Sequence, residues 1–202
     1  MSEIPNSKIV SHKLNLYISL LLLGGLYFAA VAGELEVDEH APEHQQPDIE
    51  YSSNDVPIMN ITAHTSEGVS PNVFEAYDVD ECGIIYNNNP AQEPSPKHGF
   101  HPTYLAQEPL FINENLNGTA ARIILTEVSG YHPSHLYGYT EIYGRSADYI
   151  LANPNGIYCD GCGFINTNRI TLATGRPRLG FSGALKGLSI EKGTVEIRGK
   201  GF

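Results

Sequence analysis

Two tight-turn signals lie only a few residues apart within residues 153–167, and this spacing restricts the chain to very short strands. Pro154 favours the second position of a β-turn because its ring sets φ. Asn155 and Gly156 tolerate the left-handed backbone angles that complete such a turn. An Asp-Gly pair at 160–161 is the next turn signal. Short apolar segments separate and flank the two turns, so the pattern favours small β-rungs over a long strand or a helix.

The remainder of the chain beyond its first 32 residues also favours β-structure. Val, Ile, Thr and Tyr dominate the apolar segments, and Gly, Pro, Asn or Ser interrupts them every few residues. The segments expected to be strands include Arg122–Val128, Tyr139–Tyr143, Tyr149–Ala152, Arg169–Thr174 and Thr194–Arg198.

A weak repeat supports a coil of parallel rungs. Ile150, Ile170 and Ile190 recur at intervals of 20 residues, each within a short strand-like segment. Short strands at such a period, separated by turns, are typical of a coil in which each rung stacks on the one before. A β-sandwich is the structural alternative, but the turn signals stand too close together for its long paired strands.

Several motifs follow one another in a fixed order along residues 55–202. They are VPIMNI (56–61), GVSPN (68–72), YDV (77–79), GIIYNN (83–88), ARIILTEV (121–128), NPNGI (153–157), GFINT (163–167) and TLATGRP (171–177). In this order they resemble the secretion domain of two-partner-secretion exoproteins. That family includes the filamentous haemagglutinins and the contact-dependent growth-inhibition toxins.

The resemblance implies an all-β fold: a right-handed parallel β-helix with an N-terminal antiparallel cap and extra-helical hairpins, preceded by a signal peptide. The acidic, asparagine-rich first half would form the cap, and the β-helix proper would begin at Ala121. Gly130–Tyr137, which contains a proline and two histidines, is expected to leave the helix as an excursion.

The resemblance also implies partners and a location. The chain would cross the inner membrane through the Sec machinery, be processed by signal peptidase, and be recognised by periplasmic domains of a dedicated outer-membrane two-partner-secretion transporter. It would be secreted, or reach the cell surface of a Gram-negative bacterium, through the periplasm. Its role would be recognition by the transporter and nucleation of β-helix folding. Contact with a host or neighbouring cell would belong to a missing C-terminal region.

Two asparagine signatures are the expected site of partner recognition or of turn formation. The first comprises Asn113, Asn115 and Leu116, and the second comprises Asn153, Pro154, Asn155, Gly156 and Ile157. In the first, Glu114 stands where the family motif NPNL has proline, which makes that turn less rigid. The transporter could recognise these residues directly, or they could simply hold turns for folding; both interpretations remain open.

Residues 1–32 have the organisation of a signal peptide. Two lysines precede an apolar segment at 14–32, in which Ala30 and Ala32 supply the small-x-small pattern that signal peptidase cleaves. An uncleaved membrane anchor is the alternative. The apolar segment is barely long enough to span a membrane, however, and no lysine or arginine follows it closely. We therefore expect cleavage after Ala32.

Charge is distributed unevenly over a chain with a net charge of −11. Residues 33–120 contain 16 Asp and Glu but only one basic side chain, Lys97, and such an acidic half argues against nucleic-acid binding. Residues 33–54 are acidic and poor in apolar side chains, so we expect a disordered leader there. The secretion domain would then comprise residues 55–202, truncated at its C-terminal end.

Cys159 and Cys162 flank the predicted Asp-Gly turn, in a chain whose signal segment would direct it to an oxidising compartment. A β-turn holds its end Cα atoms within about 7 Å, which overlaps the range of disulfides. A disulfide is therefore expected, with free thiols or a zinc site as alternatives. A zinc ion would need further ligands, for which Cys82 and the pair His132 and His135 are the candidates. Otherwise Cys82 is most simply a small buried residue.

The sequence contains no convincing catalytic constellation, metal site or cofactor motif. Glu127 and Glu141 could form a carboxylate pair, but each alternates with apolar neighbours in a predicted strand and is expected to face solvent. Parallel β-helices also occur in polysaccharide lyases, whose Asp and Arg clusters this chain lacks. Apart from the secretion module, the alternatives are a stand-alone secreted adhesin fragment and the remnant of a truncated exoprotein gene.

Overall fold

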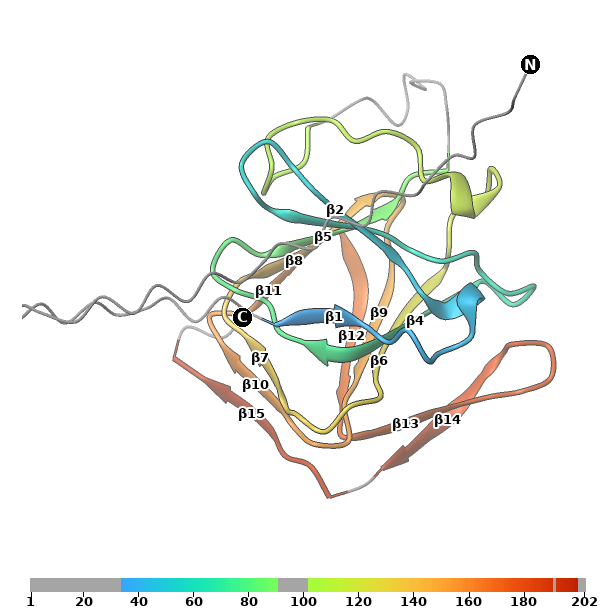
Figure 1. Cartoon of the computed structure of the whole chain (residues 1–202), viewed down its shortest axis with the longest axis vertical. Coiled ribbons are helices and arrows are strands. Elements are labelled where there is room, and N and C mark those ends of the chain that lie inside the picture. Colours follow the sequence, from blue (N-terminus) through green and yellow to red (C-terminus); the bar gives the residue numbers. More distant parts are fainter. Residues whose placement is uncertain (1–33, 91–101, 191, 200–202) are drawn as a thin grey trace, which may run out of the picture. The chain divides into compact units, whose positions relative to one another are not determined.

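The computed structural model describes residues 34–90, 102–190 and 192–199, which form three β-sheets around a buried interior (Figure 1). Sheet A contains β1 (Leu35–Val37), β4 (Val69–Tyr77), β6 (Ile123–Val128), β9 (Ala147–Ala152) and β12 (Thr167–Ala173). Sheet B contains β2 (Asp48–Tyr51), β3 (Pro57–Asn60), β5 (Ile84–Asn88), β8 (Tyr139–Gly144) and β11 (Gly163–Ile165). Sheet C contains β7 (Ser134–Leu136), β10 (Ile157–Asp160) and β15 (Val195–Arg198).

Outside these sheets, β13 (Gly175–Leu179) and β14 (Leu185–Ile190) pair as an antiparallel hairpin. Two short 3₁₀-helices, η1 (Glu43–Gln45) and η2 (Glu114–Leu116), lie in connections. Within the described ranges no helix has the length and hydropathy that a membrane crossing requires.

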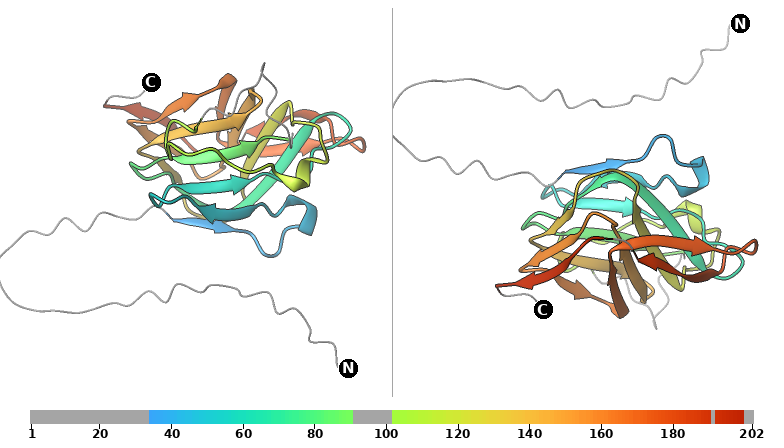
Figure 2. Two further views of the ribbon diagram at one scale, coloured as in Figure 1. Left: turned by 90° about the horizontal axis from the view of Figure 1, so that it is seen from above. Right: turned by 90° about the horizontal axis from the view of Figure 1, so that it is seen from below.

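From β5 onward, apart from the β13–β14 hairpin, the chain visits the three sheets in a constant order, B then A then C. One turn of the coil is β8, β9 and β10, and the next is β11, β12 and β15. Each strand pairs in parallel with the strand one turn earlier, as β9 does with β6 and β10 does with β7 (Figure 2). Parallel strands joined by such crossovers wind right-handed. The predicted right-handed parallel β-helix is confirmed.

The 20-residue isoleucine period does not describe the register. Ile170 pairs with Tyr149, whereas Ile150 pairs with Thr171. Ile190 belongs to the β13–β14 hairpin, where it pairs with Gly175. Successive turns of the coil differ in length because turns and the hairpin are inserted at corners, so isoleucines at equal intervals in sequence need not stack.

The prediction of a disordered leader at residues 33–54 is wrong. Strand β1 pairs antiparallel with β4, and β2 pairs antiparallel with β3, so the leader supplies the N-terminal cap. The Asp38 carboxylate also accepts a hydrogen bond from the Ser129 hydroxyl at 2.7 Å. The composition predicted that the leader would bury too little apolar surface to become ordered. Its strands instead pair with the free edges of β3 and β4, and this satisfies backbone N–H and C=O groups that would otherwise lack partners.

The β-helix also begins earlier than expected. Strands β3, β4 and β5 already pair in parallel with strands of the following turn, so the coil starts at Pro57 and not at Ala121. The predicted excursion at Gly130–Tyr137 is wrong as well, since β7 lies within it and pairs with β10. Pro133 precedes the first residue of β7, where a missing N–H does not break the ladder.

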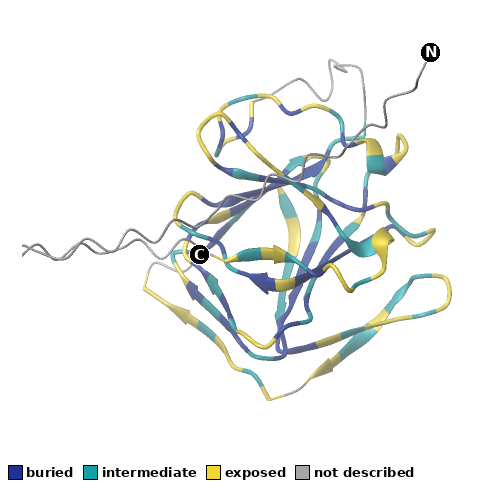
Figure 3. Ribbon diagram, viewed as in Figure 1, coloured by how far each residue is buried: buried dark blue, intermediate teal, exposed yellow. Residues whose placement is uncertain are grey.

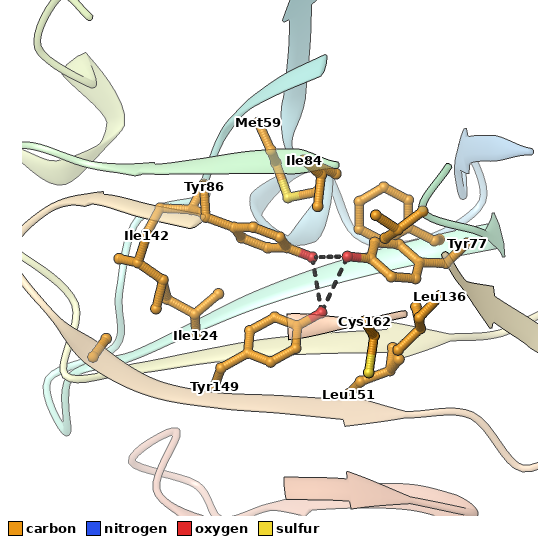
Figure 4. Close-up of a cluster of buried hydrophobic side chains, with 14 of the residues drawn as sticks. Met59, Tyr77, Ile84, Tyr86, Ile124, Leu136, Ile142, Tyr149, Leu151 and Cys162 are labelled. Carbon is orange, nitrogen blue, oxygen red and sulfur yellow. Dashed lines mark hydrogen bonds between the residues drawn. The ribbon is translucent and has the colours of Figure 1, made fainter. Parts of the chain in front are cut away.

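The core of the coil is largely apolar and encloses a cluster of tyrosine hydroxyl groups. Tyr77, Tyr86 and Tyr149 are all at most 2% exposed and direct their phenol oxygens toward one another (Figure 4). The Tyr86 hydroxyl donates to Tyr77 at 2.8 Å, and it lies 3.2 Å from the Tyr149 hydroxyl and 2.9 Å from Thr126 Oγ1. Burial raises the pKa of all three phenols above the ordinary value of 10.0, so each remains a protonated hydroxyl.

Two extra-helical segments cover the outer faces of two sheets. On sheet B, Ile58 and Ile85 face outward and pack with Ala106 and Leu110 from residues 102–110, which we call the covering loop. On sheet A, the outward residues Val69, Leu125 and Ile150 form a second cluster with Leu185 of the hairpin. As a result, nearly every residue of β4, β5 and β9 is buried (dark blue in Figure 3), although one face of each strand lies outside the coil.

Candidate functional site: two asparagine turns

Asn153 lies at the corner between β9 and β10 and is completely buried. Its side-chain oxygen accepts hydrogen bonds from the Asn155 backbone N–H at 2.9 Å and from Asn155 Nδ2 at 3.1 Å. Its Nδ2 donates to the His132 carbonyl and to Ser134 Oγ, both at 3.0 Å. The side chain therefore closes its own turn and ties that turn to the preceding turn of the coil.

The other residues of this signature complete the corner. Asn155 Nδ2 donates to the Gly130 carbonyl at 2.9 Å, which adds a second bond to the preceding coil. The Gly156 N–H closes the turn on the Asn153 carbonyl at 3.2 Å. Gly156 has φ +127°, a backbone angle that a side chain disfavours. Ile157 starts β10 and is fully buried in the core.

Asn113 has the same geometry at the corner that leads into η2. Its side-chain oxygen accepts from the Asn115 N–H at 3.1 Å, and its Nδ2 donates to the carbonyls of Ile61 at 2.8 Å and Asn87 at 3.0 Å. The Leu116 N–H donates to the Asn113 carbonyl at 3.2 Å. Leu116 is 2% exposed and belongs to the core cluster.

The glutamate that replaces proline does not disrupt this turn. Glu114 is exposed and begins η2, whose N-cap is Asn113. The side-chain cap and the 3₁₀ hydrogen bond fix a conformation that proline would otherwise preorganise. Both signatures therefore form the same kind of asparagine turn. In each, the amide oxygen of the first asparagine accepts from the backbone N–H two residues later, and its Nδ2 donates to two acceptors elsewhere in the fold.

The folded protein hides the asparagines at the head of both turns. Asn153 is 0% exposed and Asn113 is 2% exposed, and every polar atom of the two amides has a hydrogen-bond partner. Asn115 and Asn155 are half-buried. A partner that meets the folded domain can therefore not contact the amides of Asn113 and Asn153; it could contact them only in a chain that has not yet folded.

The cysteines of the 159–162 turn lie immediately after the Asn153 corner. Cys159 and Cys162 form a disulfide, and their side chains are 1% and 3% exposed within the core cluster. Cys82 is exposed, so the expectation that it is buried is wrong. Its N–H donates to Asp80 Oδ1 at 2.9 Å in a tight turn that directs the side chain outward.

Comparison with known proteins identifies the family to which this fold belongs. The family model described as the TPS secretion domain matches residues 33–202. The chain belongs to the TPS secretion domain family. The match begins at the cap strands, which agrees with an ordered segment at 35–51 and not with a domain that starts at 55.

Relatives of this secretion domain are much longer proteins. The Toxin CdiA of Yersinia pestis is 41% identical over 185 residues, which are 91% of this chain and 5% of that protein. The Hemolysin of Proteus mirabilis is 42% identical over 146 residues, which are 72% of this chain and 9% of that protein. The chain thus spans less than a tenth of the length of both.

A crystal structure of a filamentous hemagglutinin secretion domain has the same architecture. It superposes with a TM-score of 0.67 at 35% sequence identity, covering 82% of this chain and 50% of that one. The two-partner-secretion resemblance of the sequence motifs is therefore confirmed by the family model, by the relatives and by the fold.

Within the part of the chain that the structure describes, the candidate zinc ligands from the sequence do not form a metal site. The described residues contain no group of three or more His, Cys, Asp or Glu side chains that could hold a metal ion. The Nδ1 atom of His135 lies 3.4 Å from Asp78 Oδ1, and its ring stacks on Tyr158 with centroids 5.4 Å apart. His132 contributes its carbonyl oxygen to the Asn153 amide.

Glu127 and Glu141 do not form a carboxylate pair, because they lie on sheets A and B respectively. The expectation that Glu141 faces solvent is wrong, since it is 3% exposed. Its two oxygens accept hydrogen bonds from the backbone N–H groups of Tyr104 and Leu105, both at 2.9 Å. Glu141 thus fastens the covering loop to sheet B.

Two buried polar residues have structural roles that the sequence analysis did not predict: Glu141 at the covering loop and Asn88 at the end of β5. An isolated glutamate in an alternating strand carries no signal of burial, because the covering loop that buries it is distant in sequence. Asn88 exchanges two hydrogen bonds with the backbone of Ala121 and donates a third to the Arg145 carbonyl at 2.8 Å. The GIIYNN motif was the available signal for this third asparagine corner.

Glu127 makes the stability of the secretion domain depend on pH. Burial raises the pKa of the Glu127 carboxyl above its ordinary value of 4.5, the Arg176 guanidinium at 3.7 Å opposes this rise, and Asp38 adds to it. A carboxyl whose pKa is higher in the folded state disfavours folding once it is ionised; this penalty decreases as the pH falls through the folded pKa and is gone below the unfolded pKa.

We therefore expect Glu127→Gln to raise the free energy of unfolding at pH 7 relative to the parent, and the difference to vanish near pH 4. Urea denaturation at a series of pH values measures it. A variant less stable than the parent at pH 7 would instead mean that the ion pair with Arg176 outweighs burial. Glu36→Gln, at an exposed position of the cap, is the matched control and should change little.

Proposed function

We propose that this secretion domain directs export of a longer exoprotein across the outer membrane, through a dedicated β-barrel transporter whose periplasmic domains recognise it. The match to the TPS secretion domain over residues 33–202, together with the hemagglutinin-like fold, is the observation that supports this proposal. Residues 1–32 act as a signal peptide in this proposal and are removed after Ala32. They lie outside the described residues, as do Ala30 and Ala32.

Recognition takes place before folding. The amide groups of Asn113 and Asn153 are exposed in an unfolded chain and enclosed in the folded one. The transporter then contacts the two signatures while the chain is extended, and the signatures form corners of the coil after passage. They comprise Asn113, Asn115 and Leu116, and Asn153 to Ile157.

Folding outside the cell contributes to the direction of movement. The cap strands β1 and β2 pair with β4 and β3, so the first coil can close as soon as the N-terminal residues emerge. Each later coil adds parallel pairs to an existing edge, and a chain that has folded on the far side is withdrawn from the unfolded pool. The domain thus nucleates the β-helix.

The test compares two variants that both destabilise the folded domain. Asn153→Ala removes an amide of the signature, and Tyr86→Phe removes a core hydroxyl without altering either signature. If the signature is recognised directly, Asn153→Ala should be secreted about tenfold less than Tyr86→Phe, a larger difference than the gap between their melting temperatures explains. Quantitative immunoblotting of culture medium measures secretion, and intact-mass spectrometry of the secreted material should give a chain that begins at Gly33.

Equal loss of secretion by both variants would show that the asparagine turns act through folding alone. An intact N-terminal segment in most secreted molecules would contradict the signal-peptide proposal. Asn155→Asp is unsuitable for this test. The Asn155 Nδ2 donates to the Gly130 carbonyl at 2.9 Å. An aspartate would place a carboxylate oxygen against that carbonyl oxygen, and the repulsion would destabilise the turn itself.

A further inference from the structure

The β13–β14 hairpin is a cationic element in an acidic protein. Residues 175–190 contain Arg176, Arg178 and Lys186 and no Asp or Glu, while the whole chain carries a net charge of −11. Arg178 and Lys186 are exposed, and no ion pair within the described ranges involves either of them. Arg176 differs, since it pairs with Glu127.

The tip of this hairpin presents an aromatic side chain to solvent. Phe181 is fully exposed, and the flanking Leu179 and the distal Ile190 are 36% and 65% exposed. The tip itself is fixed in place: Thr65 Oγ1 donates to the Gly183 carbonyl and Ser66 Oγ donates to the Ser182 carbonyl, both at 3.2 Å. A rigid turn that carries an exposed aromatic loses little conformational entropy when that side chain is buried elsewhere.

The geometry points to a contact between this hairpin and the surface of an anionic phospholipid bilayer. Phe181 inserts at the level of the headgroups, and Arg178 and Lys186 lie against the phosphates. Aromatic side chains favour the membrane interface, and basic side chains beside them are attracted to anionic lipids. The hairpin lies outside the coil along one side of the domain (Figure 1), so the coil does not block this approach.

The charge distribution orients the domain for such a contact. Residues 33–120 carry 16 acidic side chains and one basic one, so the cap half is repelled by an anionic surface. The hairpin is attracted to the same surface, and this asymmetry turns the hairpin toward the bilayer before contact. Phe111, which follows the covering loop, is also 93% exposed. No lysine or arginine occurs at 102–121, so this second exposed phenylalanine lacks the basic neighbours that the hairpin has.

The chain contains no tryptophan, which allows a site-specific optical test. Phe181→Trp introduces one fluorophore at the hairpin tip, and Phe111→Trp places one at a similarly exposed position as the matched control. Each purified variant is titrated with vesicles of phosphatidylcholine alone or with 30% phosphatidylglycerol. We expect a blue shift and quenching by brominated lipid for Phe181→Trp with the anionic vesicles only.

The contribution of charge is measured by fluorescence in the Phe181→Trp background, and the contribution of the aromatic ring is measured by sedimentation of the protein with vesicles. Arg178→Gln with Lys186→Gln should weaken vesicle partitioning about 25-fold, since each cation near an anionic surface contributes about fivefold. Phe181→Ser should weaken it about tenfold, as expected for partial burial of a phenylalanine. These side chains are exposed, so the melting temperatures of the variants should equal that of the parent.

Three results would overturn the inference: an equal blue shift from Phe111→Trp, equal binding to uncharged vesicles, or no loss with the double charge variant. Absence of any vesicle binding would also overturn it and would direct attention to a protein partner for the hairpin. The measurement uses purified folded domain and vesicles alone, so its outcome is independent of the export assay.

Discussion

Replacing Asn153 by alanine should lower the free energy of unfolding by about 3 kcal/mol, because several buried groups lose their hydrogen-bond partners at once. The His132 carbonyl, Ser134 Oγ and the Asn155 N–H all bond to this one amide. Ser134 is fully buried, and the bonds to the His132 carbonyl and the Asn155 N–H are partly buried, so water replaces the lost amide incompletely. For a domain of this size the melting temperature should fall by about 6–12 °C.

Asn113→Ala is the internal comparison and should cost about as much, since its amide makes the same kind of bonds to Asn115, Ile61 and Asn87. Asn168→Ala is the matched control, because Asn168 is exposed in β12 and is not among the residues with a positive φ. Differential scanning calorimetry of the three variants measures the effect. Similar melting temperatures for Asn153→Ala and Asn168→Ala would show that the asparagine turn contributes little to stability.

Replacing Tyr86 by alanine should have a larger effect still, with a loss of about 4 kcal/mol from the cavity that it leaves in the coil. Tyr86 is 0% exposed, and its ring packs edge-to-face against Tyr149 with centroids 5.3 Å apart. The same change also removes the hydroxyl that bonds to Tyr77, Tyr149 and Thr126. Urea denaturation should show a much lower midpoint with cooperative unfolding retained.

Tyr86→Phe separates the two contributions, because it keeps the ring and removes only the hydroxyl. We expect a loss of about 2 kcal/mol, in the range for leaving buried hydroxyl groups unpaired. Combining it with Thr126→Val should cost less than the sum of the two single changes, since both remove the same bond. Tyr104→Ala is the control, as Tyr104 is 77% exposed and its backbone N–H, not its ring, bonds to Glu141. Strict additivity would contradict a coupled hydroxyl network.

Local turn chemistry was predictable because it depends on residues close together in the chain. Pro154, Asn155 and Gly156 favour a turn whichever fold surrounds them, and the structure places the turn between β9 and β10. The segments at 122–128 and 149–152 likewise became β6 and β9, since the β-branched and aromatic side chains that dominate them favour strands.

Long-range partners were not predictable from composition or spacing. The acidic leader has too little apolar surface to fold by itself. Strand β1 is nevertheless ordered because β4, much later in the chain, offers it backbone partners, and β2 is held by β3, whose other edge pairs with the more distant β5. Glu141 looked like a surface residue until the covering loop brought Tyr104 and Leu105 onto it. Cys82 looked like a buried residue until the turn at Asp80 directed it outward.

The sequence alone therefore determined the type of element and the family, through short motifs whose turn geometry is local and whose order along the chain is specific. Only the tertiary structure decided which residues stack in successive coils, which outer faces are covered, and that Asn113 and Asn153 are enclosed. The physical reason is that burial and hydrogen-bond satisfaction are set by segments that meet across the coil, such as Thr65 with Gly183. Their separation in sequence leaves no local signal of that contact.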